Sequence, residues 1–339
     1  MIITGLCTTF LIIIGDQFDG AFASLVGDQF CDSWYLNRDI VMPATSLVLI
    51  LPMCYTKKID FLKYSSVFGV FTMVYIVALI FTEYVVGDHV PGNIKTKPVK
   101  WVDVFTVIPV ICFGYQCHVS VIPIYSCMKN RNMKHFSIAS SCAIAICVIT
   151  YTTAAIFGYL TFGSEVSPDI LTNYSANKSS VMIALVAMAL KTFTTYPIIS
   201  FCGREGVSTI IKDVFVKDDN PRNEKLRRYV IATVWFICSL LMAIEIPNIG
   251  AVINMLGSLA AIFIFVFPGV CLLQTTLMQD PTVSNNRSKL SISIAVILLL
   301  LGAFLFGCVL TQAVIFNLSS DSIETPLCVP NGEPRLFTS

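Results

Sequence analysis

The chain has 339 residues, of which 55% are apolar and only 13% are charged. A soluble globular domain carries about 25% charged residues, so the chain has too few charges to coat a water-facing surface. The mean hydropathy of +0.77 agrees. These values exclude a soluble enzyme, and the many bulky apolar residues exclude a disordered chain. The balance of 22 basic and 21 acidic residues argues against a nucleic-acid partner. What remains is an integral membrane protein with many spans.

Nine apolar stretches, nearly free of Asp, Glu, Lys and Arg, follow one another along the chain. A helix needs about 20 apolar residues to cross ~30 Å of hydrocarbon, and most of the stretches reach or approach that length. A β-barrel would show alternating segments of about 10 residues, which these stretches lack. We therefore predict an all-α protein with helices at residues 1–15, 39–56, 64–86, 102–124, 136–162, 179–201, 228–245, 249–276 and 290–317.

The basic residues of the predicted loops are shared unequally between the two sides of the membrane. With a cytoplasmic N-terminus, fifteen Lys and Arg residues fall on the cytoplasmic side and six on the other; Lys191, within a span, completes the 22. Because cytoplasmic loops carry the excess of basic residues, we predict a cytoplasmic N-terminus and an extracytoplasmic C-terminus. The transmembrane domain is expected at 1–317, with an extracytoplasmic tail at 318–339.

Two kinds of modification are predicted on the extracytoplasmic side. The sequons at Asn173 and Asn177 both fall in the predicted outer loop 163–178, where a glycoprotein carries its glycans. Cys31 and Cys328 are the two of the 13 cysteines predicted to lie outside, in an oxidising environment. They either form a disulfide or remain two free thiols.

The fourth span is interrupted by Pro109, Gly114 and Pro123, and its centre carries polar side chains: Tyr115, Gln116, His118 and Ser120. Proline removes a backbone donor and clashes with the preceding turn. Irregular backbone at membrane depth is tolerated only where it is buried in protein or lines a wet cavity. Broken helices of this type build substrate sites in transporters. The alternative is an ordinary kinked helix whose polar side chains bond to neighbours.

The sixth span carries Lys191 at its centre, with Thr194 and Thr195 on the same helix face. A charge at that depth costs about 2.5–3.5 kcal/mol on insertion scales, so the lysine is expected to face the protein interior and to have a task. Hydroxyl oxygens suit a hard cation, and a fixed ammonium could replace one electrostatically. The alternative is a lysine that reaches a helix carbonyl or a vestibule water.

Other chemistry leaves no sign in the sequence. We find no CxxC pair, and so expect no metal site. We also find no GxxxxGK[ST], GxSxG or HExxH motif, and no loop is long enough to hold a nucleotide-binding domain. Transport would therefore be secondary or facilitated. The first span begins at Met1 without a charged segment before it, which we interpret as a chain that lacks upstream sequence.

Several segments resemble the sodium-coupled neutral amino acid transporters of the amino acid/auxin permease superfamily, and most closely their lysosomal glutamine-transporting branch. They are LIIIGDQFD at 11–19, SWYLNRD at 33–39, FGYQCHVSVIPIY at 113–125, TTYPIISFCGRE at 194–205 and IPNIGAVINMLGSLAAIFIFVFPG at 246–269. The resemblance implies a LeuT-like inverted-repeat fold of eleven helices. The nine spans match family helices 3–11, with the first two absent.

The resemblance also implies the site residues. In the family, the substrate lies between the unwound centres of helices one and six, and sodium between helices one and eight. The fourth and sixth spans here match helices six and eight. The implied substrate contacts are Gly114, Tyr115, Gln116, Cys117 and His118. The implied ion site includes Thr194 and Thr195. Lys191 departs from the family pattern. Its ammonium would repel a sodium ion one turn away, so proton coupling or sodium-independent exchange stays open.

Two functions are consistent with these features. The first is secondary transport of neutral amino acids, glutamine among them, by alternating access coupled to Na⁺ or H⁺, in a lysosomal or plasma membrane. It needs no enzyme activity and no cofactor beyond the coupling ion. The expected partners are a small neutral amino acid and membrane lipid, without nucleic acid, and the oligomeric state stays open. The alternative is a truncated, non-transporting isoform or a regulatory membrane subunit.

Overall fold

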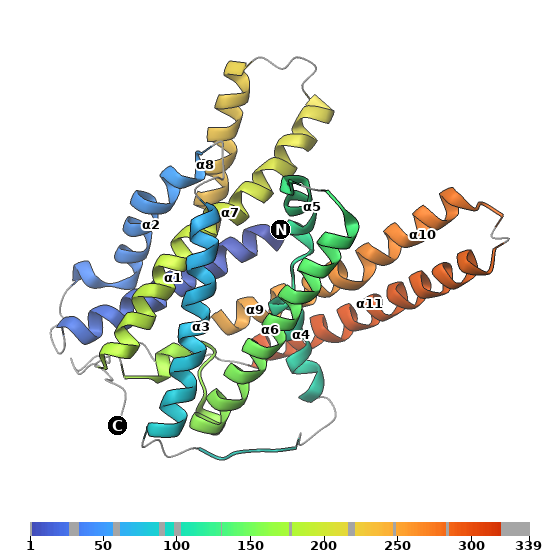
Figure 1. The fold of residues 1–339 in the computed structure, drawn as a ribbon. Helices are drawn as coiled ribbons and strands as arrows, with labels where there is room; N and C mark the ends of the chain where they lie inside the picture. Colours follow the sequence, from blue (N-terminus) through green and yellow to red (C-terminus); the bar gives the residue numbers. More distant parts are fainter. Residues whose placement is uncertain are drawn as a thin grey trace.

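The computed structural model describes residues 2–26, 34–56, 62–87, 92–97, 103–129, 131–175, 178–215, 221–246, 249–282 and 285–319. Within these residues the secondary structure is helical and contains no strand. Figure 1 shows the helices in chain order from blue to red.

The helices follow the apolar stretches of the sequence. They are α1 (Ile2–Val26), α2 (Arg38–Cys54), α3 (Leu62–Val86), α4 (Asp103–Gly114), α5 (His118–Cys127), α6 (Met133–Phe162), α7 (Ser179–Phe215), α8 (Pro221–Glu245), α9 (Ile249–Ala261), α10 (Phe267–Gln279) and α11 (Asn286–Ser319). Short 3₁₀ turns lie at Trp34–Leu36, Gly163–Glu165 and Ile170–Asn173, and a π-helical turn at Ile262–Val266 joins α9 to α10.

All nine predicted spans are helical in the described part of the chain. Seven helical spans there are long and apolar enough to cross a membrane on their own. The other two are exceptional for visible reasons. The apolar part of α2, Ile40–Cys54, is shorter and contains two prolines, and the fourth predicted span is divided between α4 and α5. The fold is that of an all-α, multi-pass membrane protein.

The prediction that the first helix ends at residue 15 is wrong, because α1 continues to Val26. Its first charge does not stop it, since the Asp16 carboxylate forms an ion pair with Arg38 of α2 at 2.7 Å. The sixth span extends beyond its predicted end at residue 201, because α7 runs unbroken through Pro197 to Phe215. A proline can be accommodated in a membrane helix when neighbouring groups satisfy the freed carbonyl.

The core forms around α1, which packs against α2, α7, α8 and α9. Leu11, Ile12 and Ile14 of α1 are fully buried there, together with Tyr196 of α7 and Phe236 of α8. By contrast, α6 and α11 bury little of their apolar surface, as expected for helices that face lipid. Association in the bilayer rests on such close packing and on interhelical hydrogen bonds.

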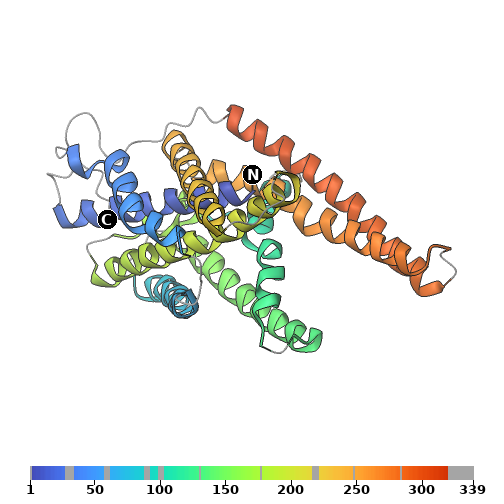
Figure 2. The same ribbon diagram turned by 90° about the horizontal axis from the view of Figure 1, so that it is seen from above.

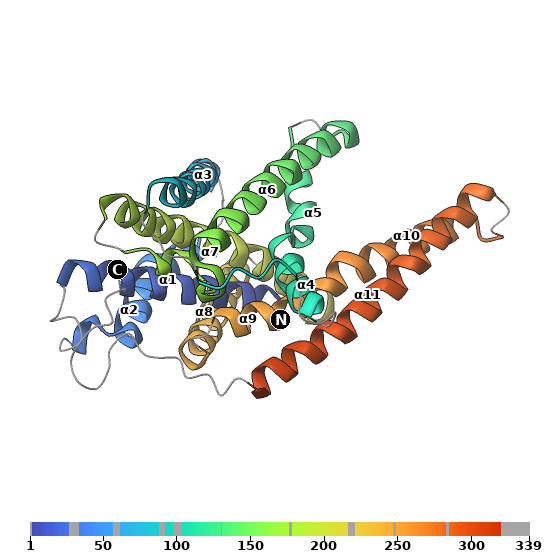
Figure 3. The same cartoon turned by 90° about the horizontal axis from the view of Figure 1, so that it is seen from below.

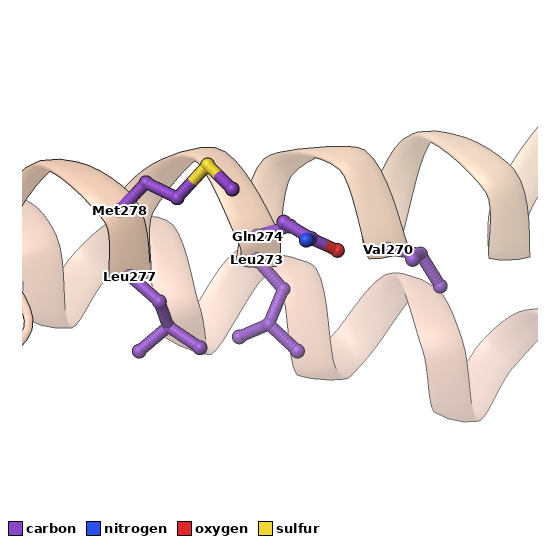
Figure 4. A pocket seen from close by; sticks show the side chains of 5 residues that line it. All are labelled: Val270, Leu273, Gln274, Leu277 and Met278. Atoms are coloured by element: carbon purple, nitrogen blue, oxygen red, sulfur yellow. The ribbon is translucent and has the colours of Figure 1, made fainter.

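The C-terminal hairpin of α10 and α11 projects away from the other helices, as Figures 1 and 2 show. The two helices pack against each other along their length. A shallow groove on the hairpin is lined by side chains of α10 alone: Val270, Leu273, Gln274, Leu277 and Met278 (Figure 4). Four of these five side chains are apolar and the fifth is the Gln274 amide, so the groove is a mainly apolar surface feature of the hairpin, separate from the interrupted helix.

Candidate functional site

The predicted interruption of the fourth span is confirmed. The α4 helix ends at Gly114 and α5 begins at His118, with Tyr115, Gln116 and Cys117 between them. Figure 3 shows α4 and α5 as separate rods beside α6. No side chain caps the start of α5, so the N–H groups of its first turn lack a partner within the helix. The break therefore presents backbone donors and the positive end of a helix dipole.

Several polar side-chain atoms at the break are shielded from solvent but not hydrogen-bonded to any described residue. Both polar atoms of the Gln116 amide, and Nδ1 of His118, are shielded from solvent without a partner in the described structure. Leaving such a buried group unsatisfied costs about 1–3 kcal/mol. Three unsatisfied atoms within three residues therefore lower the stability of the fold, and hydrogen bonds to a bound polar ligand would remove that penalty.

One wall of the break comes from α6, which the sequence analysis did not assign to the site. The Tyr115 and Tyr151 rings pack edge to face with centroids 5.5 Å apart, and the Tyr151 hydroxyl lies 3.5 Å from the Gly114 carbonyl oxygen. The available signal was the polar run Thr150–Thr153 in the middle of an otherwise apolar span. Tyr151 therefore belongs among the candidate site residues.

Three oxygen atoms gather on α7 at the position predicted for an ion. The hydroxyls of Thr194 and Thr195 each donate to the Lys191 carbonyl oxygen at 2.8 Å. Each hydroxyl oxygen keeps lone pairs that can bind a cation, and oxygen ligands suit hard cations. The expected shared face of these three residues is confirmed.

The Lys191 side chain extends toward α3. Its ammonium nitrogen lies 3.5 Å from the Met73 sulfur, and its stem passes close to Gly69. It forms no ion pair with a residue that the structure describes. The ammonium and the carbonyl of Lys191 therefore serve different neighbours, one on α3 and one within α7.

The residues of the α4–α5 break and the candidate ion ligands of α7 lie on helices that contact each other. The α5 helix contacts α7, yet no described hydrogen bond joins Gln116 or His118 to Thr195. The described contacts therefore do not join the two groups into one hydrogen-bonded site.

A second polar cluster, which sequence reasoning missed, lies at the predicted outer end of α1. Gln17, only 1% exposed, donates from Nε2 to Asp169 Oδ2 at 2.8 Å. Asp169 Oδ1 accepts from the Leu171 backbone N–H at 3.0 Å and so caps the turn Ile170–Asn173. Burial raises the pKa of the Asp169 carboxyl and, on the same segment, raises the pKa of Tyr174 to about 12. The cluster fastens the segment between α6 and α7 onto α1.

The remaining predicted residues are only partly described. The Asn173 side chain bonds within its own loop, accepting from the Ser167 N–H at 2.8 Å and donating to the Glu165 carbonyl at 3.3 Å. Its glycosylation stays a prediction. Asn177, Cys31 and Cys328 lie outside the described residues.

The fold and the broken helix are those of a multi-pass membrane transporter, and comparison with known proteins agrees. The family described as transmembrane amino acid transporter protein matches residues 3–315. The chain is 39% identical to sodium-coupled neutral amino acid transporter 7 of Homo sapiens over 321 residues, which are 93% of this chain and 69% of the human protein. Identity to its Danio rerio counterpart is 38%, over 91% of this chain and 68% of that protein.

A further relative is the putative sodium-coupled neutral amino acid transporter 8 of Xenopus tropicalis. It is 32% identical over 325 residues, which are 91% of this chain and 72% of that protein. The chain belongs to the transmembrane amino acid transporter family, within the group of sodium-coupled neutral amino acid transporters. It is a membrane transporter and not an enzyme.

Proposed function

We propose that the chain carries neutral amino acids, glutamine among them, by alternating access at the α4–α5 break. The observation that carries this proposal is the buried, unpartnered amide of Gln116 beside the uncapped start of α5. A helix N-terminus favours an anion, and the carboxylate of an amino acid is one. An amide offers both a donor and an acceptor, which match the side-chain amide of glutamine.

Selectivity for neutral substrates follows from the charges at the break. Residues 114–118 include no Asp, Glu, Lys or Arg, and backbone dipoles suffice to bind a zwitterion. A charged substrate side chain would enter a site that offers no counter-ion there, and burying an unpaired charge is costly. We therefore expect glutamine and similar amino acids to bind more tightly than glutamate or lysine.

For the coupling ion, we propose the three oxygens of α7 as ligands in sodium coupling: the Lys191 carbonyl and the Thr194 and Thr195 hydroxyls. Because these residues are one turn apart, a charged Lys191 opposes sodium at this position. Proton coupling through Lys191 is the alternative mechanism within the same proposal. The two mechanisms differ in whether uptake follows the sodium gradient or the proton gradient.

The test is uptake of radiolabelled glutamine into proteoliposomes that contain the purified chain. Gln116→Leu should raise the KM for glutamine about tenfold, as expected for loss of about 1.4 kcal/mol of binding. The matched control is Gln274→Leu, which removes an exposed amide from α10, far along the chain in the projecting hairpin. Equal kinetics for the two variants would contradict the proposed site. No uptake by the unmodified chain would favour the non-transporting alternative.

A further inference from the structure

Three arginine side chains gather where α7 and α8 pack together, at their predicted cytoplasmic ends. Arg204 belongs to α7, and Arg227 and Arg228 belong to α8. The Arg227 Nε–H donates to the Ser208 hydroxyl, 3.2 Å away and one turn beyond Arg204 on α7. Arg228 lies near enough to Arg204 for their like charges to repel. The two helices pack against each other, and Figure 1 shows their ends diverging toward the top of the view.

Arg204 is held in place by a structural task. It is 2% exposed, and its two terminal nitrogens donate to the carbonyls of Cys54 at 2.6 Å and Thr56 at 3.3 Å. These bonds close the C-terminal end of α2, whose last carbonyls have no partner within the helix. The guanidinium also lies over the Phe201 ring, 4.9 Å from its centroid. Arg204 is therefore a fixed positive charge inside the protein.

Several N–H donors of the three arginines remain without a hydrogen-bond acceptor among the described residues. Nε of Arg204, Nη2 of Arg227 and Nε of Arg228 are all buried without a partner in the described structure. One acid beside the cluster, Glu205, is 3.9 Å from Arg204 with a side chain 57% exposed, and such a surface pair contributes little. Neither Arg227 nor Arg228 forms an ion pair with a described residue. Repulsion and unsatisfied donors thus coincide at one place.

We propose that this arginine cluster, Arg204 with Arg227 and Arg228, binds a phosphate group. One phosphate would relieve both costs, because it carries up to two negative charges and several acceptor oxygens, and guanidinium groups match it geometrically. A carboxylate has only two oxygens for three separate donors. The cluster lies at the predicted inner edge of the membrane, where basic pockets between helices bind phosphorylated headgroups. The source is a phosphoinositide headgroup or a soluble phosphate compound.

The test uses the full chain purified in detergent, with four probes. They are a short-chain phosphatidylinositol bisphosphate, a short-chain phosphatidylserine, soluble inositol trisphosphate and inorganic phosphate. Binding is measured by titration and by the rise in Tm, since a ligand that binds only the folded state raises its stability. We expect the inositol phosphates to bind and to raise Tm. Failure of all phosphate-bearing probes to bind would overturn the proposal.

Variants distinguish binding at the arginine cluster from non-specific attraction of phosphate to any positive charge. Arg228→Gln and Arg227→Gln should each weaken binding about tenfold or more, as for a lost hydrogen bond between charged groups. The control is Lys225→Gln, which removes an exposed positive charge from the same helix and should leave affinity unchanged. Arg228→Lys keeps the charge but loses the planar fork, and should give an intermediate affinity with native Tm. An equal loss from Lys225→Gln would overturn the proposal.

The probes also identify the source of the phosphate. Tighter binding of the phosphoinositide than of soluble inositol trisphosphate, with loss in Arg228→Gln, supports a lipid headgroup. Equal binding of the two, with the same loss, supports a soluble phosphate compound. Binding of phosphatidylserine as tight as that of the bisphosphate would contradict a site built for a phosphate with two free charges.

Discussion

Gln116 and His118 differ from the threonines of the membrane helices in what they contact. Threonine hydroxyls donate to a carbonyl of their own helix, as Thr192 does to the Met188 carbonyl at 2.7 Å, so their hydrogen-bond donors are satisfied without a substrate. The Gln116 amide and His118 Nδ1 have no such hydrogen-bond partner among the described residues, because the helix is interrupted between α4 and α5. Polar character alone therefore does not mark a substrate site; at the break the signal is three polar atoms within three residues that have no partner in the described structure.

Lys191 is predicted to set the ion dependence of transport. Lys191→Met removes the ammonium while keeping an apolar stem against Met73 of α3. If sodium binds the three oxygens of α7, loss of a like charge one turn away should lower the sodium concentration for half-maximal uptake about tenfold, or by ~1.4 kcal/mol. Sodium and pH titrations of glutamine uptake measure this. Unaltered curves for both ions would remove Lys191 from the mechanism.

At the scale of elements, close backbone contact sets the position of α4. A Cβ added to Gly257 of α9 would overlap the Pro109 carbonyl oxygen, so glycine is needed for α9 to approach α4 just before the break. Gly257→Ala should push the helices apart, lower Tm and reduce uptake severely. Gly307→Ala on α11 is the control, because nothing lies within 4 Å of its added Cβ. Equal Tm values for the two variants would contradict this role.

The outer segment between α6 and α7 is predicted to depend on Asp169. Asp169→Ala removes both the bond from Gln17 and the cap on Leu171, and should cost about 1–3 kcal/mol locally. Hydrogen exchange over residues 163–175 should rise. Thr282→Ala, a change in another loop whose side chain bonds to Asp280, should leave that exchange unchanged. Native protection in Asp169→Ala would show that other contacts hold the segment.

The same carboxyl predicts a pH dependence. Because burial raises the pKa of Asp169 above the usual value, the folded protein holds this proton more tightly than the unfolded chain does. Its contribution to stability is therefore fully present below the usual pKa and is lost as pH rises through the raised pKa. Asp169→Asn should abolish this fall while keeping an amide partner for Gln17. Identical pH profiles of Tm for the variant and the parent would contradict the assignment.

At the scale of the whole molecule, hydropathy and length located the spans because membrane helices must be long and apolar. What hydropathy could not locate were ends governed by partners far along the chain. Asp16 stays in α1 because Arg38 pairs with it, and α7 continues past Arg204 because α2 supplies carbonyls to that arginine. Such pairings require the tertiary fold, which one sequence does not reveal.

The residues of the candidate site likewise include some that the local sequence predicts and some that depend on the tertiary fold. The break at Gly114–His118 was predictable from the local sequence, because Gly114 and a run of polar residues interrupt the apolar stretch between Pro109 and Pro123. A proline alone does not predict a break, since α7 continues through Pro197. The contribution of Tyr151 depends on α6 lying against the break, and the turn of Lys191 toward Met73 depends on the position of α3. The local sequence pattern thus identified the interrupted helix, whereas the neighbouring residues on other helices could be identified only from the packed structure.

The central claim is that a neutral amino acid occupies the α4–α5 break, and Cys117 offers a direct test. This thiol is exposed within the break, and Cys142 is exposed on α6. The measurement is the rate at which a membrane-permeant maleimide labels each cysteine, followed by peptide mass spectrometry. The account predicts that saturating glutamine slows labelling of Cys117 about tenfold, by occupying the site. Cys142 should be unaffected, and Gln116→Leu should lose the protection. Labelling of Cys117 at one rate with and without glutamine would contradict the account.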